Sequence, residues 1–149
     1  GGYFLRVALQ PGFTQAVVNL ADLYRIQGRE AEGEKILRQA LRGDPHHAPT
    51  QHALGLMLIG QKRLPEALAA LAEAYRLGSD NPRYGYVYAV TLNSVGQTVL
   101  AARTLEKVLA KHTHDRDTLM ALAGFQRAAG NLNVALDYAQ RLAALDADQ

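Results

Sequence analysis

Large apolar and small residues return along the chain at a fixed interval of 34 positions. One column of this repeat is large and apolar, and the next column is small. The large column holds Leu20, Leu54, Tyr88 and Leu122, and the small column holds Ala21, Gly55, Ala89 and Ala123. A period of about 20 to 50 residues is typical of solenoids, in which each unit buries its apolar side against the next.

Two further columns follow in each unit at spacings of three and four, which place residues on one face of a helix. They hold Gly33, Ala67, Ala101 and Ala135, then Leu37, Leu71, Leu105 and Ala139. Each unit therefore predicts a pair of amphipathic helices. The first helices are expected near residues 14–27, 48–61, 82–95 and 116–129, and the second near 30–42, 64–77, 98–111 and 132–145.

Glycine and proline punctuate this pattern. The break between the two helices of each unit falls at Gly28, Lys62, Gly96 and Gly130. The first turns of three predicted helices contain Pro49, Pro65 and Pro82, where the missing N–H costs nothing. Two glycines, Gly43 and Gly78, follow second helices, where a positive φ is useful.

The interval divides the chain into four units without insertion, at 14–47, 48–81, 82–115 and 116–149. Residues 1–13 are expected to hold the end of a preceding unit's second helix, over 3–9, and a connection. We expect the chain to be a segment of a longer protein.

The pattern Leu20-Ala21-x-x-Tyr24, followed by Gly28, Leu37 and Pro45 at the spacing of the period, resembles the tetratricopeptide repeat over about nine-tenths of the chain. The family's frequent tryptophan is replaced here, and only Pro45 keeps the closing proline. The resemblance implies an all-α fold, a right-handed α-α superhelix of about four helix-turn-helix repeats plus part of a preceding repeat.

In tetratricopeptide proteins the first helices line a concave groove that binds peptides or partner helices. The resemblance implies that the groove is formed by Gln15, Val18, Asp22, Arg25, His52, Leu56, Ile59, Arg83, Tyr86, Val90, Asn93, Asp117, Met120 and Arg127. The centre of this set is apolar and its ends are charged, which favours a partner surface. The alternative is that some of these residues are buried between repeats.

Composition narrows the classes of partner. The chain is 48% hydrophobic and 20% charged, as ordinary globular domains are. Sixteen Lys and Arg residues balance fourteen Asp and Glu residues to a net charge of +2, and the basic residues are scattered. We therefore expect no nucleic-acid partner, since a phosphate footprint needs clustered basic residues. No apolar run is long enough to predict membrane insertion. The compartment, cytoplasmic or periplasmic, is unknown.

Chemical function has little support in the sequence. The chain has no cysteine, which excludes disulfides, thiolate metal sites and a cysteine nucleophile. Four of the five histidines, His46, His47, His112 and His114, fall near turns and are best explained as solvated. A triad of Ser94, His52 and Asp22 can be nominated, but no catalytic motif supports it. We expect no metal, no cofactor and no enzymatic activity.

The surfaces outside the groove give two further expectations. Basic residues on second helices, such as Arg38, Arg42, Arg103 and Lys107, are expected to form a solvated convex face. The last predicted helix carries Leu136, Tyr138, Ala139 and Leu142 with no following helix to shield them. We expect this end to associate with another copy or to be covered by more chain.

Two functions remain open. The leading one is a non-catalytic protein–protein interaction scaffold that binds a peptide or helix in the groove. The alternative is an accessory tetratricopeptide domain of a larger bacterial enzyme, because residues 64–77 and 83–97 resemble repeats appended to exported bacterial multihaem cytochrome-type proteins.

Overall fold

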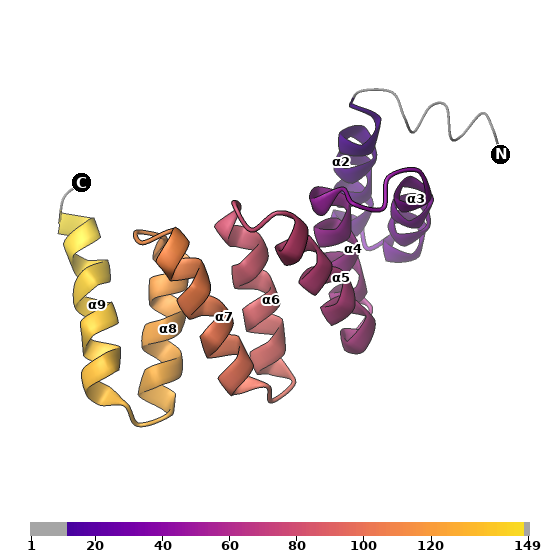
Figure 1. Ribbon diagram of the computed structural model, residues 1–149. Coiled ribbons are helices and arrows are strands. Elements are labelled where there is room, and N and C mark those ends of the chain that lie inside the picture. Colours follow the sequence, from indigo (N-terminus) through magenta and orange to yellow (C-terminus); the bar gives the residue numbers. More distant parts are fainter. Residues whose placement is uncertain (1–11, 148–149) are drawn as a thin grey trace. The chain divides into compact units, whose positions relative to one another are not determined.

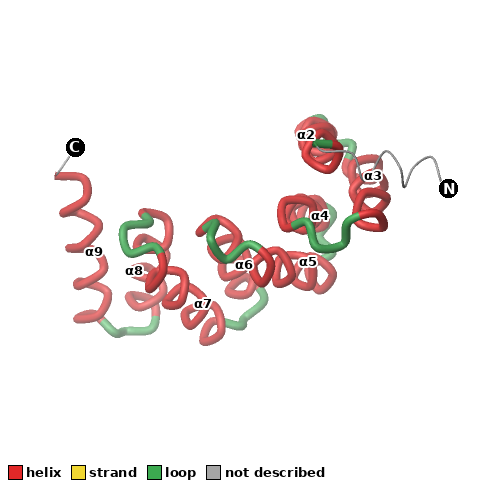
Figure 2. Tube along the Cα trace, turned by 45° about the horizontal axis from the view of Figure 1, so that its top comes forward, coloured by secondary structure: helices red, strands yellow, loops and turns green. Residues whose placement is uncertain are grey.

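The computed structural model of the chain describes residues 12–147, which form eight α-helices and no strand (Figure 1). The helices are α2 (Phe13–Ile26), α3 (Glu30–Gly43), α4 (Ala48–Gly60), α5 (Leu64–Leu77), α6 (Pro82–Ser94), α7 (Thr98–Lys111), α8 (Arg116–Ala128) and α9 (Leu132–Ala147). Short loops join them in sequence (Figure 2). The predicted all-α fold is confirmed over these residues. The helix end expected over 3–9 lies outside the described residues.

The helices form two compact units, which are described separately. The first unit ends at Gly78 and contains α2 to α5, and the second begins at Ser79 and contains α6 to α9. All helix ends lie within two residues of the predicted positions. As expected, Pro49, Pro65 and Pro82 occupy one of the first two positions of α4, α5 and α6.

The turn inside each hairpin has a left-handed residue where the sequence predicts a break. The φ angles are 75° at Gly28, 87° at Gly96 and 84° at Gly130, and Lys62 takes the same place with φ 60°. Beyond this residue the chain folds back onto the first helix. The N–H of Arg29 donates to the carbonyl of Tyr24 at 2.8 Å, and that of Arg63 to Leu58 at 3.0 Å. These bonds are typical of Schellman ends, which satisfy the last carbonyls of a helix.

The prediction of a positive φ at Gly43 and Gly78, after the second helices, is wrong. Gly43 is the last residue of α3, and Gly78 has a φ of −126°. The N–H of Asp44 donates to Ala40 at 3.0 Å, and the N–H of Gly78 donates to Ala74 at 2.8 Å. Because Asp44 is already extended, with φ −146°, the chain leaves α3 without needing a left-handed residue.

The core of the first unit lies around α4, which packs against α2, α3 and α5. Its buried cluster consists of Ala21, Leu37, Leu54, Met57, Leu58, Ala67 and Ala70. Two glycines allow close helix contact. A Cβ built on Gly33 would lie 2.5 Å from Met57 Cε, and one built on Gly55 would overlap the side chain of Leu71. The columns of small residues therefore mark where helices meet.

In the second unit, α6 packs on α7, α8 packs on α9, and α8 also contacts α6 and α7. The buried side chains include Val87, Leu92, Ala101, Leu105, Val108, Leu109, Leu119 and Leu122. Thr91 and Thr104 are buried as well, and their hydroxyls donate to the carbonyls of Val87 and Leu100 at 2.8 Å. These hydrogen bonds satisfy polar atoms that water does not reach.

Two members of the predicted core columns are exposed, and Tyr88 and Ala123 are half-buried. Leu20 is 44% exposed, whereas Leu54 in the same column is 4% exposed. Ala139 is exposed, whereas Leu37 is fully buried. The reason is position, because no described helix precedes α2 and none follows α9. Within residues 12–147, no helix has both the length and the apolar character that crossing a bilayer requires.

Candidate partner-binding surface

The predicted groove residues lie on the first helix of each hairpin and fall into two sets, one in each unit. The α2/α4 face of the first unit consists of Gln15, Val18, Asp22, Arg25, His52, Leu56 and Ile59. The α6/α8 face of the second unit consists of Arg83, Tyr86, Val90, Asn93, Asp117, Met120 and Arg127. The helices within each pair contact each other, so each set lies on adjacent elements.

The apolar part of the α2/α4 face is largely used by the core. Val18 and Ile59 are half-buried and pack against the core cluster of the first unit. Leu56 and His52 are half-buried too. The alternative of burial between repeats therefore describes this part of the set better than an open groove does.

Gln15, Asp22 and Arg25, the polar residues that α2 contributes to this face, bind side chains of their own helix. Arg25 Nη2 lies 2.5 Å from Asp22 Oδ1, one turn away, and Gln15 donates to Asn19 at 3.1 Å. Both charged side chains are more than one-third exposed, so their ion pair contributes at most about 1 kcal/mol.

The α6/α8 face is more open. Met120 is 54% exposed and Val90 is 39% exposed. An ion pair across the two helices, Arg83 Nη1 to Asp117 Oδ2 at 3.8 Å, shows which sides of α6 and α8 meet. Tyr86 lies one turn beyond Arg83, and Met120 lies one turn beyond Asp117. The two side chains are therefore on the sides of the helices that carry this pair.

The α6/α8 face carries exposed side chains of both charge signs, including Arg83 and Asp117. Arg83 and Asp117 are 57% and 58% exposed, so water screens their attraction. The guanidinium carbon of Arg83 also lies 5.7 Å from the centre of the Tyr86 ring, a cation–π contact. Asn93 is half-buried and Arg127 is exposed. The face thus combines apolar side chains with a charged rim.

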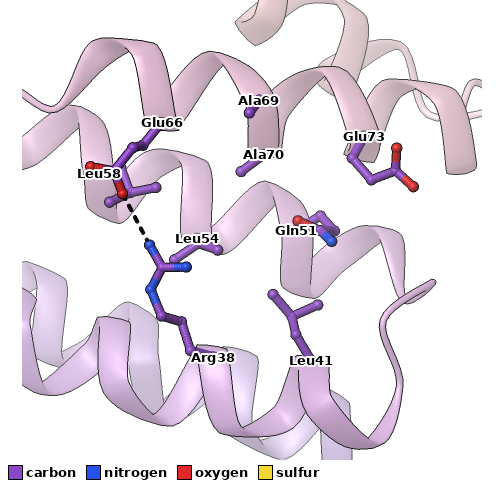
Figure 3. A pocket seen from close by; sticks show the side chains of 9 residues that line it. All are labelled: Arg38, Leu41, Gln51, Leu54, Leu58, Glu66, Ala69, Ala70 and Glu73. Carbon is purple, nitrogen blue, oxygen red and sulfur yellow. Dashed lines mark hydrogen bonds and ion pairs between the residues drawn. The ribbon is translucent and has the colours of Figure 1, made fainter.

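A cleft that the sequence did not predict crosses α3, α4 and α5 in the first unit (Figure 3). Its volume is about 500 Å³. The floor includes the buried Leu54, Leu58 and Ala70, and Arg38 and Glu66 face each other across it. Arg38, which we expect on a solvated face, has a side chain that is 42% exposed and also lines this cleft.

Arg38 belongs to an ion-pair network centred on Glu34, whose side chain is only 14% exposed. Arg38 Nε lies 2.8 Å from Glu34, and Arg63 Nη1 lies 2.6 Å from it. Gln61 Nε2 also donates to Glu34 at 2.9 Å, and Arg38 reaches Glu66 at 3.4 Å. The network joins α3 to α5 and to the turn before it. The spacing of Glu34 and Arg38 is a sequence signal for one pair, but not for the contacts between helices.

Glu34 stays ionised because of these partners. Burial by itself would raise the pKa of its carboxyl group. Hydrogen bonds from Arg38, Gln61 and Arg63 outweigh burial and lower the pKa below its usual value. The network therefore stabilises the folded state when Glu34 is charged.

The histidines are only partly solvated, in contrast to the prediction. His46 and His114 are exposed, but His47 and His112 are half-buried. His47 Nδ1 lies 2.7 Å from Thr50 Oγ1, and His112 Nε2 donates to the carbonyl of Ser79 at 3.2 Å. Among residues 12–147, no three His, Asp or Glu side chains are grouped to hold a metal ion.

Two members of the nominated triad, Ser94 and Asp22, each bind a group on their own helix. Ser94 lies at the end of α6, where its hydroxyl donates to the carbonyl of Thr91 at 2.6 Å. Asp22 pairs with Arg25 on its own helix.

Comparisons with known proteins agree with this architecture. The family model described as tetratricopeptide repeat matches residues 11–147. The TPR repeat-containing protein YpiA of Bacillus subtilis (strain 168) is 24% identical over 119 residues. That match covers 80% of this chain and 28% of YpiA, so the chain spans less than a third of that relative.

Solved structures share the fold. The crystal structure of MamA has a TM-score of 0.82 at 16% identity, and the match covers 93% of this chain and 81% of that one. The crystal structure of YrrB, a TPR protein with an unusual peptide-binding site, has a TM-score of 0.73 at 20% identity. It matches over 87% of this chain and 67% of its own. At these identities the likeness concerns the fold.

Proposed function

Because the chain belongs to the tetratricopeptide repeat family, we propose that it is a non-catalytic scaffold that binds a peptide or helix of a partner protein. Four repeat units, 14–47, 48–81, 82–115 and 116–149, each contribute one hairpin in this proposal. The family fold and the peptide-binding site of the similar protein YrrB both support a protein-binding role.

The α6/α8 face is the proposed site for the partner segment. The observation that carries this choice is the exposure of Val90 and Met120, two large apolar side chains on adjacent first helices. Neither is needed to complete the described core. An exposed apolar patch with a charged rim is typical of partner surfaces. The α2/α4 face has a smaller part in the proposal, since Val18 and Ile59 already pack on the core.

The free energy available from the two apolar side chains shows which other contacts a partner needs. Covering Val90 and Met120 fully would contribute about 0.5 to 1.5 kcal/mol each, because each side chain is already about half buried. A micromolar complex needs about 8 kcal/mol after the costs of association. Tyr86 and the charged groups of the rim must therefore contribute as well. A suitable segment carries two or three apolar side chains on one side and charges of both signs at its ends.

The test is affinity capture with the chain and with Met120→Asp, followed by mass spectrometry. A carboxylate at position 120 would have to be desolvated under the partner, so partners of this face should be lost. Each partner lost is then mapped to a short peptide, and its affinity for both forms is measured by fluorescence anisotropy. We expect at least a tenfold weaker affinity for Met120→Asp.

Val134→Asp is the matched control, because Val134 is also exposed, at 45%, but lies on α9. It should retain every partner that Met120→Asp loses. Equal affinity of a mapped peptide for the chain and for Met120→Asp would refute the α6/α8 site.

The comparisons give no support to the alternative of an accessory domain of a larger cytochrome-type enzyme. A second element of the proposal is self-association through the terminal helices. It agrees with the exposure of Leu136 on α9, at 55%, and of Leu23 on α2, at 60%.

A further inference from the structure

The packing of α4 in the first unit provides a template for how one repeat receives the next. Leu54 and Met57 of α4 are buried in one cluster with Ala21 of α2 and Leu37 of α3. The end of Met57 sits against Gly33, whose missing Cβ makes room for it. The α2/α3 hairpin thus forms an acceptor around Ala21, Gly33 and Leu37, and α4 contributes two large apolar side chains as the donor.

The same acceptor recurs on the last hairpin. Ala123, Ala135 and Ala139 lie 102 residues, or three periods, after Ala21, Gly33 and Leu37. Together with Gly124, Arg127, Leu132 and Leu136 they line a groove of about 370 Å³ between α8 and α9. Leu132 is 66% exposed and Leu136 is 55% exposed. No helix among residues 12–147 fills this groove in the way that α4 fills its equivalent.

The matching donor is present on α2. Leu20 and Leu23 lie one period before Leu54 and Met57, and so occupy the same positions on a first helix. They are 44% and 60% exposed, whereas Leu54 and Met57 are almost fully buried. The described chain therefore presents an acceptor on its last hairpin and a donor on its first.

The side chains of this contact differ in size from those of the template at three positions. The acceptor position that is Gly33 in the template is Ala135 in the last hairpin, which adds a methyl group to the floor. The donor position that is Met57 in the template is Leu23 in α2, and leucine reaches one bond less far from Cβ than methionine. The shorter donor compensates for this added methyl group. Ala139, which stands where the template has Leu37, leaves further room in the groove.

We propose that a second copy of this chain docks its α2 into the α8/α9 groove, with Leu23 against Ala135, so that copies join head to tail. The contact is heterologous, because the surface used on one copy differs from that used on the other. An assembly of any length keeps one free donor at one end and one free acceptor at the other. The assemblies should therefore become longer as the protein concentration rises. This head-to-tail contact rests on the self-association proposed above and specifies the surfaces that meet. The contact shares Arg127 with the α6/α8 face but leaves Val90 and Met120 free for the proposed partner.

The first test is sedimentation velocity of the full 149-residue chain over a wide range of concentrations. We expect a weight-average mass that rises steadily with concentration. Leu23→Asp, which blocks the donor, and Leu136→Asp, which blocks the acceptor, should each remain monomeric. Because both side chains are exposed in a single copy, the variants should keep the helical circular dichroism and the melting temperature of the parent.

Mixing the two variants is the decisive experiment. Leu23→Asp keeps its acceptor and Leu136→Asp keeps its donor, so an equimolar mixture should form dimers and nothing larger. Leu20→Asp and Leu132→Asp provide a second pair should either of the first variants fail to fold. Met120→Asp should associate like the parent, which separates this proposal from the proposed partner binding.

Three outcomes would overturn the proposal. A parent chain that stays monomeric at the highest attainable concentration has no such contact, and its ends are then covered by something other than a second copy. A Leu23→Asp variant that still dimerises uses a symmetric contact instead. A mixture that stays monomeric shows that the donor and acceptor do not fit.

Discussion

Lys62 holds the place in its hairpin turn that Gly28 holds in the turn before, and both residues are left-handed, with φ angles of 60° and 75°. Glycine takes this conformation freely, whereas an L-residue with a side chain pays about 1 to 2 kcal/mol. The turn between α4 and α5 is therefore strained at one residue, while its counterparts at Gly96 and Gly130 are not.

Replacing Lys62 with glycine should stabilise the protein. The relief of strain exceeds the extra chain entropy that glycine loses on folding, about 0.4 to 1 kcal/mol. We expect Lys62→Gly to raise the free energy of unfolding by about 0.5 to 1 kcal/mol. The measurement is urea unfolding followed by circular dichroism, with an unchanged slope and a higher midpoint.

Lys35→Gly is the control, since Lys35 is an equally exposed lysine but lies within α3. There glycine should lower stability by about 1 kcal/mol, because the backbone is helical. A lower midpoint for Lys62→Gly than for the parent would show that the left-handed lysine carries no strain.

Gly55 should be the reverse case, a glycine that cannot gain a methyl group. A Cβ at this position would overlap the Leu71 side chain, which is fully buried between α4 and α5. Overpacking of this kind costs about 1 to 3 kcal/mol, against a gain in helix propensity of about 1 kcal/mol. We expect Gly55→Ala to lower the free energy of unfolding by about 1 to 2 kcal/mol in the same urea experiment.

Gly124→Ala isolates the helix propensity from the packing. Gly124 lies within α8, and a Cβ there would meet nothing within 4 Å. The substitution should therefore raise stability by about 0.5 to 1 kcal/mol. If Gly55→Ala raised the midpoint as Gly124→Ala should, the close approach of α4 and α5 would not limit residue size.

Glu34 should make stability depend on pH. Its pKa in the folded state is lowered, so its contribution is complete above the pKa of the unfolded chain, about 4.3, and is lost as pH falls through the lower folded value. Glu34→Gln removes the charge but keeps the shape. We expect it to cost about 1 to 2 kcal/mol at neutral pH, as hydrogen bonds between charged groups do.

The cost of Glu34→Gln should shrink as the pH is lowered from 5 toward 3, where the parent also loses the charge. Urea midpoints of both proteins across that pH range provide the measurement. Glu66→Gln is the control, because Glu66 is 52% exposed and should change the midpoint less. A cost for Glu34→Gln that is constant from neutral to acid pH would mean that the network does not depend on the charge of Glu34.

The sequence predicts the helices well because their signals are local. Gly28, Gly96 and Gly130 mark turns through backbone freedom alone, and the prolines mark helix starts through a missing donor. Leu20 and Leu54 look alike in the sequence, but their burial depends on whether another helix lies beside them. The repeat pattern predicts which face of a helix is apolar. It does not predict which other helix, if any, packs against that face.

The candidate surface was predictable to a smaller extent. Val18 and Val90 both lie on faces assigned to the groove, but only Val90 is exposed, because Val18 packs on the core. The pairing of Arg63 with Glu34 joins residues 29 positions apart on different helices. Such contacts depend on the packing angle of two hairpins, which no local pattern of residue types contains.

The chain has two methionines and no cysteine, and the two thioethers differ sharply in their access to water. Met57 is 1% exposed in the core, whereas Met120 is 54% exposed on the α6/α8 face. Mild peroxide should therefore convert Met120 to its sulfoxide first, adding a polar oxygen to the face while leaving the interior intact. Oxidative stress would then modify this protein at the Sδ atom of Met120. A methionine sulfoxide reductase would reduce the sulfoxide back to methionine.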